Sequence, residues 1–169
     1  MEIPNGGQPP FELQMEIRSA ATTAEELRTN PNTRKKALNS FLRRMTELET
    51  CFPRYRKYVR RYGLAYASGI AERSGQLRQA RKILGRALRQ KGFRDDELAA
   101  YYCSQSMLCV RLEDRRAARR AAYRGLAFGI RYGGLPLQNL VRLLDRYGWG
   151  RRLRLAEQAR RRARQQAKS

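Results

Sequence analysis

A run of thirteen residues without a charged side chain, Leu98 to Val110, constrains the fold of this chain more than any other feature. Charged residues make up 31% of the sequence, so an uncharged stretch of this length is expected to be buried. Three acids, Asp95, Asp96 and Glu97, precede the run, and negative side chains are favourable at the N-terminus of a helix. The run therefore predicts a central buried helix with other helices packed around it.

Apolar residues on both sides of this run recur three and four positions apart, which is the period of an amphipathic helix. The first such stripe should end near Thr50, because Phe52-Pro53 interrupts it. The stripes consist of Leu38, Phe41, Met45 and Leu48; Tyr55, Val59, Tyr62 and Tyr66; Leu77, Ala80, Leu84, Ala87 and Leu88; Ala118, Ala122, Leu126 and Ile130; and Leu137, Leu140, Val141 and Leu144. Together they predict an all-α fold, a compact bundle of five to six helices over residues 34–149.

Residues 1–33 are expected to form an N-terminal arm, because their first ten positions contain three prolines and two glycines. Apolar and polar residues alternate from Phe11 to Arg18, a pattern typical of a strand, but no sheet is expected nearby. We therefore predict an irregular arm here, with a frayed helix or a segment that pairs with a neighbouring molecule as alternatives. Thr23 and Glu26 match a capping box, which predicts a short helix ending before Asn30.

Residues 150–169 are expected to form an Arg-rich, C-terminal helical tail. Only Leu153, Ala156, Ala159 and Ala163 offer this segment an apolar face. A helix with so little apolar surface cannot be held by packing, so we expect it to protrude and to order fully on nucleic acid. The predicted organisation is thus an arm, a basic helical bundle and a basic tail.

The charge of the chain is large and unevenly distributed. Lysine and arginine number 37 against 15 acids, which gives a net charge of +22, and 31 of the basic residues are arginine. Residues 1–33 carry a net charge of −3, whereas residues 34–169 carry +25. Charge of this size attracts polyanions, and the planar guanidinium group of arginine binds phosphate in a bidentate manner. The helical body is therefore predicted to bind nucleic acid.

The candidate contacts are basic residues at helical spacing in segments that contain no acid, whereas an ordinary solvated face mixes both signs. Nothing in the sequence resembles a base-reading module, so we expect contacts to the phosphate backbone of RNA or single-stranded DNA, or of both. The predicted nucleic-acid-binding residues are Arg54, Arg56, Lys57, Arg60, Arg61, Arg78, Arg81, Lys82, Arg115, Arg116, Arg119, Arg120, Arg124, Arg151 and Arg152.

Residue types that usually carry catalysis are missing or badly placed. The chain has no histidine, and no glycine-rich phosphate loop lies between a strand and a helix. Asp95, Asp96 and Glu97 could hold a magnesium ion, but adjacent acids on one helical turn point in different directions. We therefore expect no enzymatic activity, no catalytic residue, no cofactor and no metal.

The cysteines and the hydropathy indicate the compartment. Three cysteines with no CxxC pair and no secretory features fit a reducing environment, and Cys103 and Cys109 are expected to pack inside a helix as small apolar groups. No apolar run approaches the ~20 residues that span a bilayer. The sequence thus predicts a cytoplasmic protein without membrane contact.

Several short pieces follow one another in the second half of the chain: Leu84-Gly85-Arg86-Ala87-Leu88, Gly92, Asp96-Glu97-Leu98, Leu135-Pro136-Leu137, Leu140, Leu143-Leu144 and Tyr147-Gly148-Trp149, followed by a basic helix. In this order they resemble the small-subunit family of multisubunit CRISPR effector complexes of the Cascade type. The resemblance covers about residues 80–160; Gly148-Trp149 reverses the order usual in the family, and the segment between the two groups of pieces is longer. It implies a non-catalytic helical subunit, present in several copies beside other subunits, that holds guide RNA and the target or displaced strand.

Two other interpretations remain open. Gly75, Ala80 and Leu88 recur as Glu113, Ala118 and Leu126 at an offset of 38, close to the 34-residue tetratricopeptide repeat, which would indicate a protein-interaction scaffold. The aromatic and proline signature of that repeat is absent. A ribosomal protein that binds ribosomal RNA, including one from an organelle, would share the charge and the lack of catalytic groups.

Overall fold

The computed structural model describes residues 9–30, 32–33, 36–132 and 135–150, and every regular element in these ranges is a helix. The α-helices are α1 (Phe11–Thr29), α2 (Ala37–Cys51), α3 (Arg56–Arg73), α4 (Leu77–Ala87), α5 (Asp95–Arg111), α6 (Arg115–Tyr132) and α7 (Leu135–Arg146). A 3-10 turn, η1 (Pro53–Tyr55), separates α2 from α3. The all-α prediction is confirmed; the described part of the chain contains seven α-helices, of which α2 to α7 lie within residues 34–149 and α1 lies in the segment predicted as an arm.

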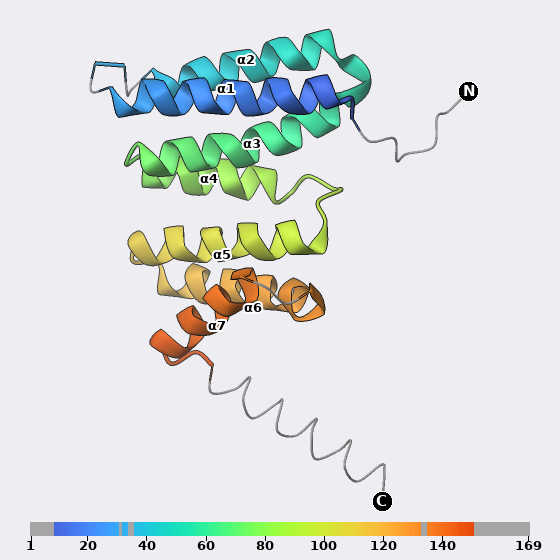
Figure 1. The fold of residues 1–169 in the computed structure, drawn as a ribbon. Helices are drawn as coiled ribbons and strands as arrows, with labels where there is room; N and C mark the ends of the chain where they lie inside the picture. The colour runs from blue at the N-terminus through green and yellow to red at the C-terminus, as the bar shows by residue number, and fades with distance from the viewer. Residues whose placement is uncertain (1–8, 31, 34–35, 133–134, 151–169) are drawn as a thin grey trace, which may run out of the picture. The chain divides into compact units, whose positions relative to one another are not determined.

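The chain divides into two compact units, Met1–Gly92 and Phe93–Ser169. In the first unit, α1 packs on α2 and α3, and α3 packs on both α2 and α4 (Figure 1). Its core contains Leu13 and Ile17 of α1, Phe41 of α2, Val59 of α3 and Leu84 of α4, and each of these side chains is buried. The sequence predicted one bundle over residues 34–149, so the division at Gly92 is a feature of the structure alone.

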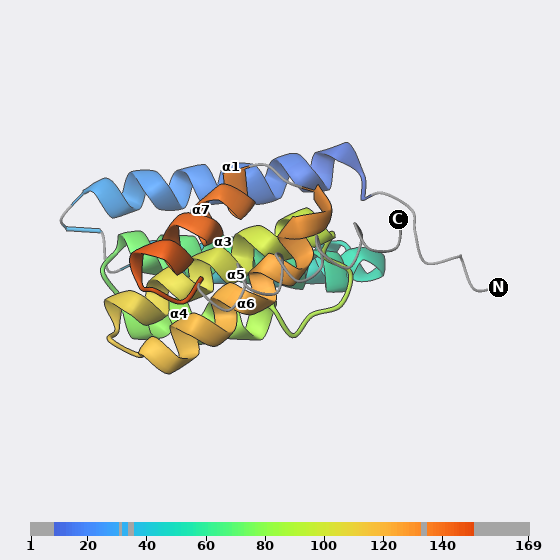
Figure 2. The same ribbon diagram turned by 90° about the horizontal axis from the view of Figure 1, so that it is seen from below.

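The second unit is built on the helix that the uncharged run predicts. Helices α5 and α6 lie side by side in both views, and α7 contacts both of them (Figure 2). The core cluster combines Cys103, Ala122, Leu126, Leu140 and Leu144. The acids mark a helix start as predicted, and Glu97 also accepts a 2.8 Å hydrogen bond from the backbone N–H of Arg94. The prediction that Cys103 and Cys109 are buried in a helix is also confirmed.

The predicted irregular arm and the predicted cap at Thr23 are wrong, whereas the predicted end of a helix before Asn30 is confirmed. Phe11–Thr29 is a continuous helix, and Thr23, which was expected to cap a short helix, lies within it. The alternating residues also fit a helix, because Leu13 and Ile17 are four positions apart and Ala24 lies two further turns along the same face. Burial of this face against α2 and α3 stabilises a helix where the local pattern favours a strand. The predicted tail, residues 150–169, lies outside the described residues except for Gly150.

Two helical hairpins, α3–α4 and α5–α6, share the same connection at an offset of 38 residues. In the first, the backbone N–H groups of 74, 75 and 76 donate to the carbonyls of 70, 72 and 71. In the second hairpin, the backbone N–H groups of residues 112, 113 and 114 donate to the carbonyls of residues 108, 110 and 109 in the same way. Gly75 and Glu113 occupy the same left-handed position, with φ of 80° and 61°. The sequence offset therefore corresponds to a repeated backbone turn.

A buried serine joins the two helices of each hairpin in the same way. Ser68 of α3 donates a 3.1 Å hydrogen bond to the carbonyl of Ala80 on α4. Ser106 of α5 donates a 2.7 Å hydrogen bond to the carbonyl of Ala118 on α6, again 38 residues later. Both alanines are fully buried, so each pair of helices approaches closely at this point. The two hairpins therefore share a buried side-chain contact between their helices as well as the same turn.

Candidate nucleic-acid interface

Helix α4 presents an exposed face with positive charge only. Arg78, Lys82 and Arg86 are exposed at intervals of four residues, and Arg81 beside them is half-buried. Four residues correspond to about 6 Å along a helix axis, so the three exposed groups form a row about 12 Å long. The helix contains no acid, and no ion pair involves Arg78, Lys82 or Arg86 in the described part of the chain. These groups are available to an external anion.

Helix α6 presents a second face of the same kind. Arg115, Arg116, Arg120 and Arg124 are exposed, and no ion pair involves them among the residues that the structure describes. Arg119 is half-buried, with its guanidinium carbon 5.5 Å from the centre of the Tyr123 ring. Asp114 precedes the helix and caps it, since its side chain accepts a 3.0 Å hydrogen bond from the backbone N–H of Ala117. That acid is therefore engaged in capping, and the stripe itself contains no negative charge.

The predicted residues around α3 lie in a different environment. Arg56 and Arg60 both pair with Glu49 of α2, at 3.1 and 2.7 Å. Partial burial of Glu49 opposes ionisation, but the hydrogen bonds from Arg60 and Arg56 outweigh it and lower the pKa of this carboxyl. Of this predicted group, Arg54 and Lys57 are exposed and have no ion pair among the described residues. The local sequence lacks an acid, but the fold supplies one.

Arg61 has a packing role in the first unit. Its guanidinium carbon lies 5.6 and 5.0 Å from the ring centres of Tyr58 and Tyr62, and Nη1 donates a 3.0 Å hydrogen bond to the carbonyl of Lys91. The side chain is half-buried, so it connects α3 to the segment after α4. It is less available to a phosphate group than the exposed residues of α4. Arg151 and Arg152 lie outside the described residues.

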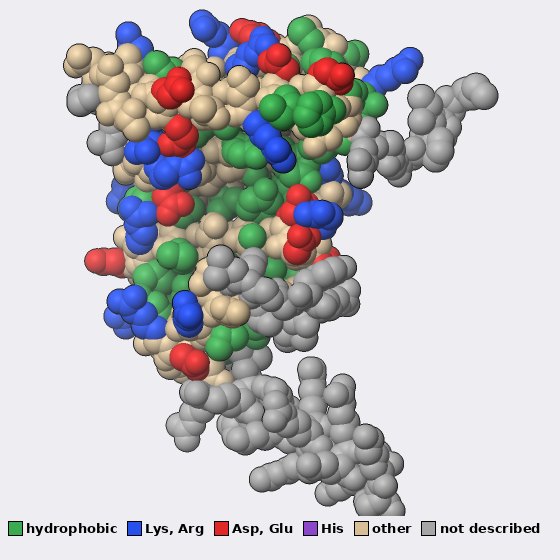
Figure 3. Space-filling view, viewed as in Figure 1, with side chains coloured by type: hydrophobic (Ala, Val, Ile, Leu, Met, Phe, Trp, Pro, Cys, Tyr) green, Lys and Arg blue, Asp and Glu red, His purple; other side chains and the backbone are tan. Residues whose placement is uncertain are grey.

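The prediction omitted Arg86, which extends the row on α4 by one turn. Its spacing from Lys82 is the same as the spacing of Lys82 from Arg78, so helical periodicity was the signal that could have found it. The exposed charges of α1 and α2 behave differently. On the face of the first unit in Figure 3, acidic and basic side chains lie next to each other. One such cluster joins Arg73 of α3 to Glu25 of α1.

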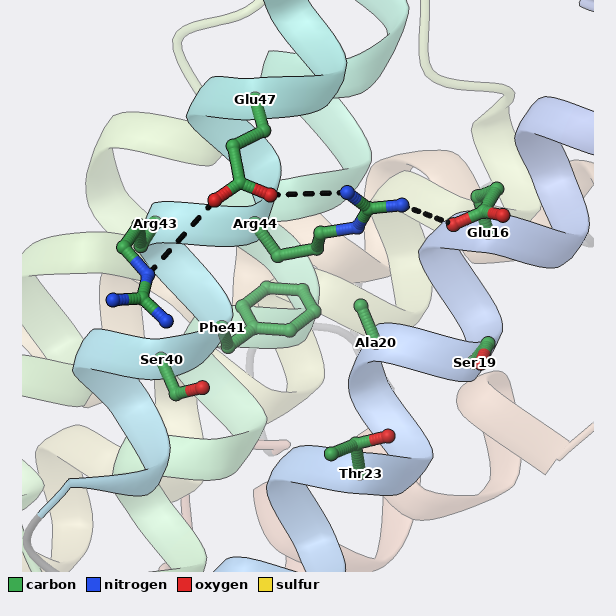
Figure 4. A pocket seen from close by; sticks show the side chains of 9 residues that line it. All are labelled: Glu16, Ser19, Ala20, Thr23, Ser40, Phe41, Arg43, Arg44 and Glu47. Carbon is green, nitrogen blue, oxygen red and sulfur yellow. Dashed lines mark hydrogen bonds and ion pairs between the residues drawn. The ribbon is translucent and has the colours of Figure 1, made fainter.

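A hollow of about 300 Å³ lies between α1 and α2, and ion pairs cross it (Figure 4). Arg44 of α2 bonds Glu16 of α1 at 2.7 Å and Glu47 at 3.0 Å, and Arg43 lies 3.9 Å from Glu47. Two arginines and two glutamates neutralise one another here, so the hollow has no charge preference for an anion. We interpret the cluster as a connection between α1 and α2.

The described ranges contain no group of three or more cysteine or acidic side chains placed to hold a metal ion. None of their helices combines the length and the apolar character required to cross a bilayer. No protein-family model, curated protein or solved structure matches the chain.

Proposed function

We propose that this protein is a non-catalytic subunit that binds the phosphate backbone of nucleic acid in a ribonucleoprotein assembly. The observation that carries the proposal is that the basic faces of α4 and α6 differ in ion pairing from the charged faces of the other helices. Arg78, Lys82 and Arg86 of α4 and Arg115, Arg116, Arg120 and Arg124 of α6 are exposed and have no ion pair among the described residues, whereas the basic side chains of α1, α2 and α3 are largely paired. Unpaired cations at helical spacing suit a polyanion and release its counterions on binding.

The test is the salt dependence of binding to a fluorescently labelled RNA oligonucleotide and to its single-stranded and double-stranded DNA equivalents. Replacing Arg78, Lys82 and Arg86 by glutamine should lower the slope of log K against log salt concentration by about 2 to 3, since each lost phosphate contact changes it by about 0.7–0.9. The matched control replaces Arg18, Lys36 and Arg43, which removes the same charge from elsewhere in the first unit. An equal fall in both variants would mean that net charge alone drives binding and would refute the assignment to α4.

The finer assignment rests on the resemblance of residues 80–160 to Cascade-type small subunits. We propose on that basis that the chain holds guide RNA and the target or displaced strand, in several copies within a CRISPR effector complex. Purification of the native complex through a tagged copy, followed by sequencing of its RNA, tests this. Short RNAs with a constant repeat-derived end support it, whereas ribosomal RNA would assign the protein to the ribosome.

The repeated hairpins favour a second candidate, a helical-repeat scaffold that binds another protein. The common turn at Gly75 and Glu113 and the common serine bonds are features of such repeats. The same purification separates the two candidates. A complex that contains stoichiometric protein partners, and that keeps its composition after nuclease treatment without any RNA or DNA, would favour the scaffold and refute nucleic-acid binding.

A further inference from the structure

The basic residues of α4 recur on α6 at the offset that relates the two hairpins. At each of four positions both helices carry a lysine or an arginine. The pairs are Arg78 and Arg116, Arg81 and Arg119, Lys82 and Arg120, and Arg86 and Arg124. Their exposure recurs as well, because the second member of each set is half-buried and the other three are exposed. We call the two sets the α4 stripe and the α6 stripe.

The hairpin framework explains why this correspondence is spatial. The turn that precedes each helix has the same hydrogen bonds, and the same buried serine fixes the helix against its partner at Ala80 or Ala118. A residue of α4 and the residue 38 positions later on α6 therefore occupy equivalent places in their two hairpins. The two stripes occupy equivalent places on two copies of one structural module.

Other positions of the two hairpins do not match. Gln79 of α4 corresponds to Ala117 of α6, and Arg89, two residues past the end of α4, corresponds to Ala127. Solubility alone does not require four cations at fixed places, because any exposed position could carry them. Basic residues at all four equivalent positions, beside neighbours that differ, favour a contact that both modules make.

From this repeat we infer that α3–α4 and α5–α6 are two equivalent phosphate-backbone-binding modules and that one chain binds nucleic acid at two sites. The inference rests on the proposed function and adds to it the number and the equivalence of the sites. A strand long enough to reach both stripes gains affinity, because the second contact becomes intramolecular. A short strand occupies each stripe separately.

The experiment uses the full chain in four forms: wild type, R78Q/K82Q/R86Q, R116Q/R120Q/R124Q and the control R18Q/K36Q/R43Q. A single-stranded RNA of about eight nucleotides, within the site sizes known for backbone-binding grooves, is titrated at low salt and its stoichiometry measured by calorimetry. Two RNAs should bind to each wild-type or control chain and one to each stripe variant. The salt slope for a longer RNA should fall by a similar amount, about 2 to 3, in both stripe variants. Circular dichroism verifies that each variant keeps the helical content of the wild type.

The outcomes separate the two proposals. If one stripe variant matches the control in stoichiometry and slope while the other loses binding, the protein has a single site and the equivalence is refuted. If wild type binds no RNA or DNA at low salt, the proposed function fails and the inference fails with it. If both stripe variants retain two bound RNAs, nucleic acid binds elsewhere on the chain and the stripes are not the sites.

Discussion

Addition of one methyl group at Gly125 should destabilise the second unit. Gly125 lies buried in α6, and a β-carbon there would be 2.9 Å from Cβ of Tyr102 on α5 and 3.0 Å from Cδ1 of Leu140 on α7. The leucine methyl can rotate away, but the tyrosine Cβ is attached to the α5 backbone, so that helix must shift. Overpacking of this kind costs about 1–3 kcal/mol. Alanine gains at most about 1 kcal/mol over glycine in helix propensity.

The steric effect is the larger of the two, so we expect Gly125→Ala to lose about 0.5–2 kcal/mol in the free energy of unfolding. Gly85→Ala is the matched control, because Gly85 lies within α4 and an added β-carbon would meet no atom within 4 Å. That variant should gain about 0.5–1 kcal/mol. Thermal unfolding should separate the variants by several degrees, because 1 kcal/mol corresponds to about 2–4 °C in a chain of this size.

Hydrogen exchange locates the effect. Faster exchange in α5, α6 and α7 of the Gly125 variant, with α1 to α4 unchanged, is the expected pattern. A Gly125→Ala protein as stable as wild type would refute the reasoning, because it would mean that α5 and α6 do not approach closely at Tyr102. The repeat provides a comparison, since the position equivalent to Gly125 is Ala87, where α4 holds a fully buried methyl group.

Three other predictions concern single side chains. Glu113→Gly should raise the melting temperature, because Glu113 has a φ of 61° and glycine relieves about 1 kcal/mol of strain there; Gly75→Ala, at φ 80°, should lower it. Glu25→Gln should lower stability at neutral pH by up to about 1 kcal/mol. Partial burial opposes ionisation of Glu25, but hydrogen bonds from Arg73 and Arg28 outweigh it and lower its pKa, so its contribution is present above the unfolded pKa and lost as pH falls through the folded pKa. Urea denaturation across the acid range should show the two proteins converging. Leu13→Ala should cost about 2–5 kcal/mol, because Leu13 is fully buried; a change below about 0.5 kcal/mol would mean that α1 is not part of the core.

Local patterns in the sequence determined most of the helices. The uncharged run gave α5 its position, Pro53 separated α2 from α3, and the acids at 95–97 marked a helix start, because periodicity, proline geometry and the helix dipole act within a few residues. The offset of 38 was also visible in the sequence. Its meaning as a repeated turn required the backbone hydrogen bonds.

The tertiary structure decided the features that depend on distant segments. The N-terminal segment is helical because α2 and α3 cover Leu13 and Ile17, which a local alternation cannot reveal. The sequence placed Arg56 and Arg60 in an acid-free stripe, but α2 brings Glu49 to them. The basic side chains that remain available to a phosphate group were therefore determined by the fold, because an ion pair depends on which helices meet and not on how close their residues lie along the chain.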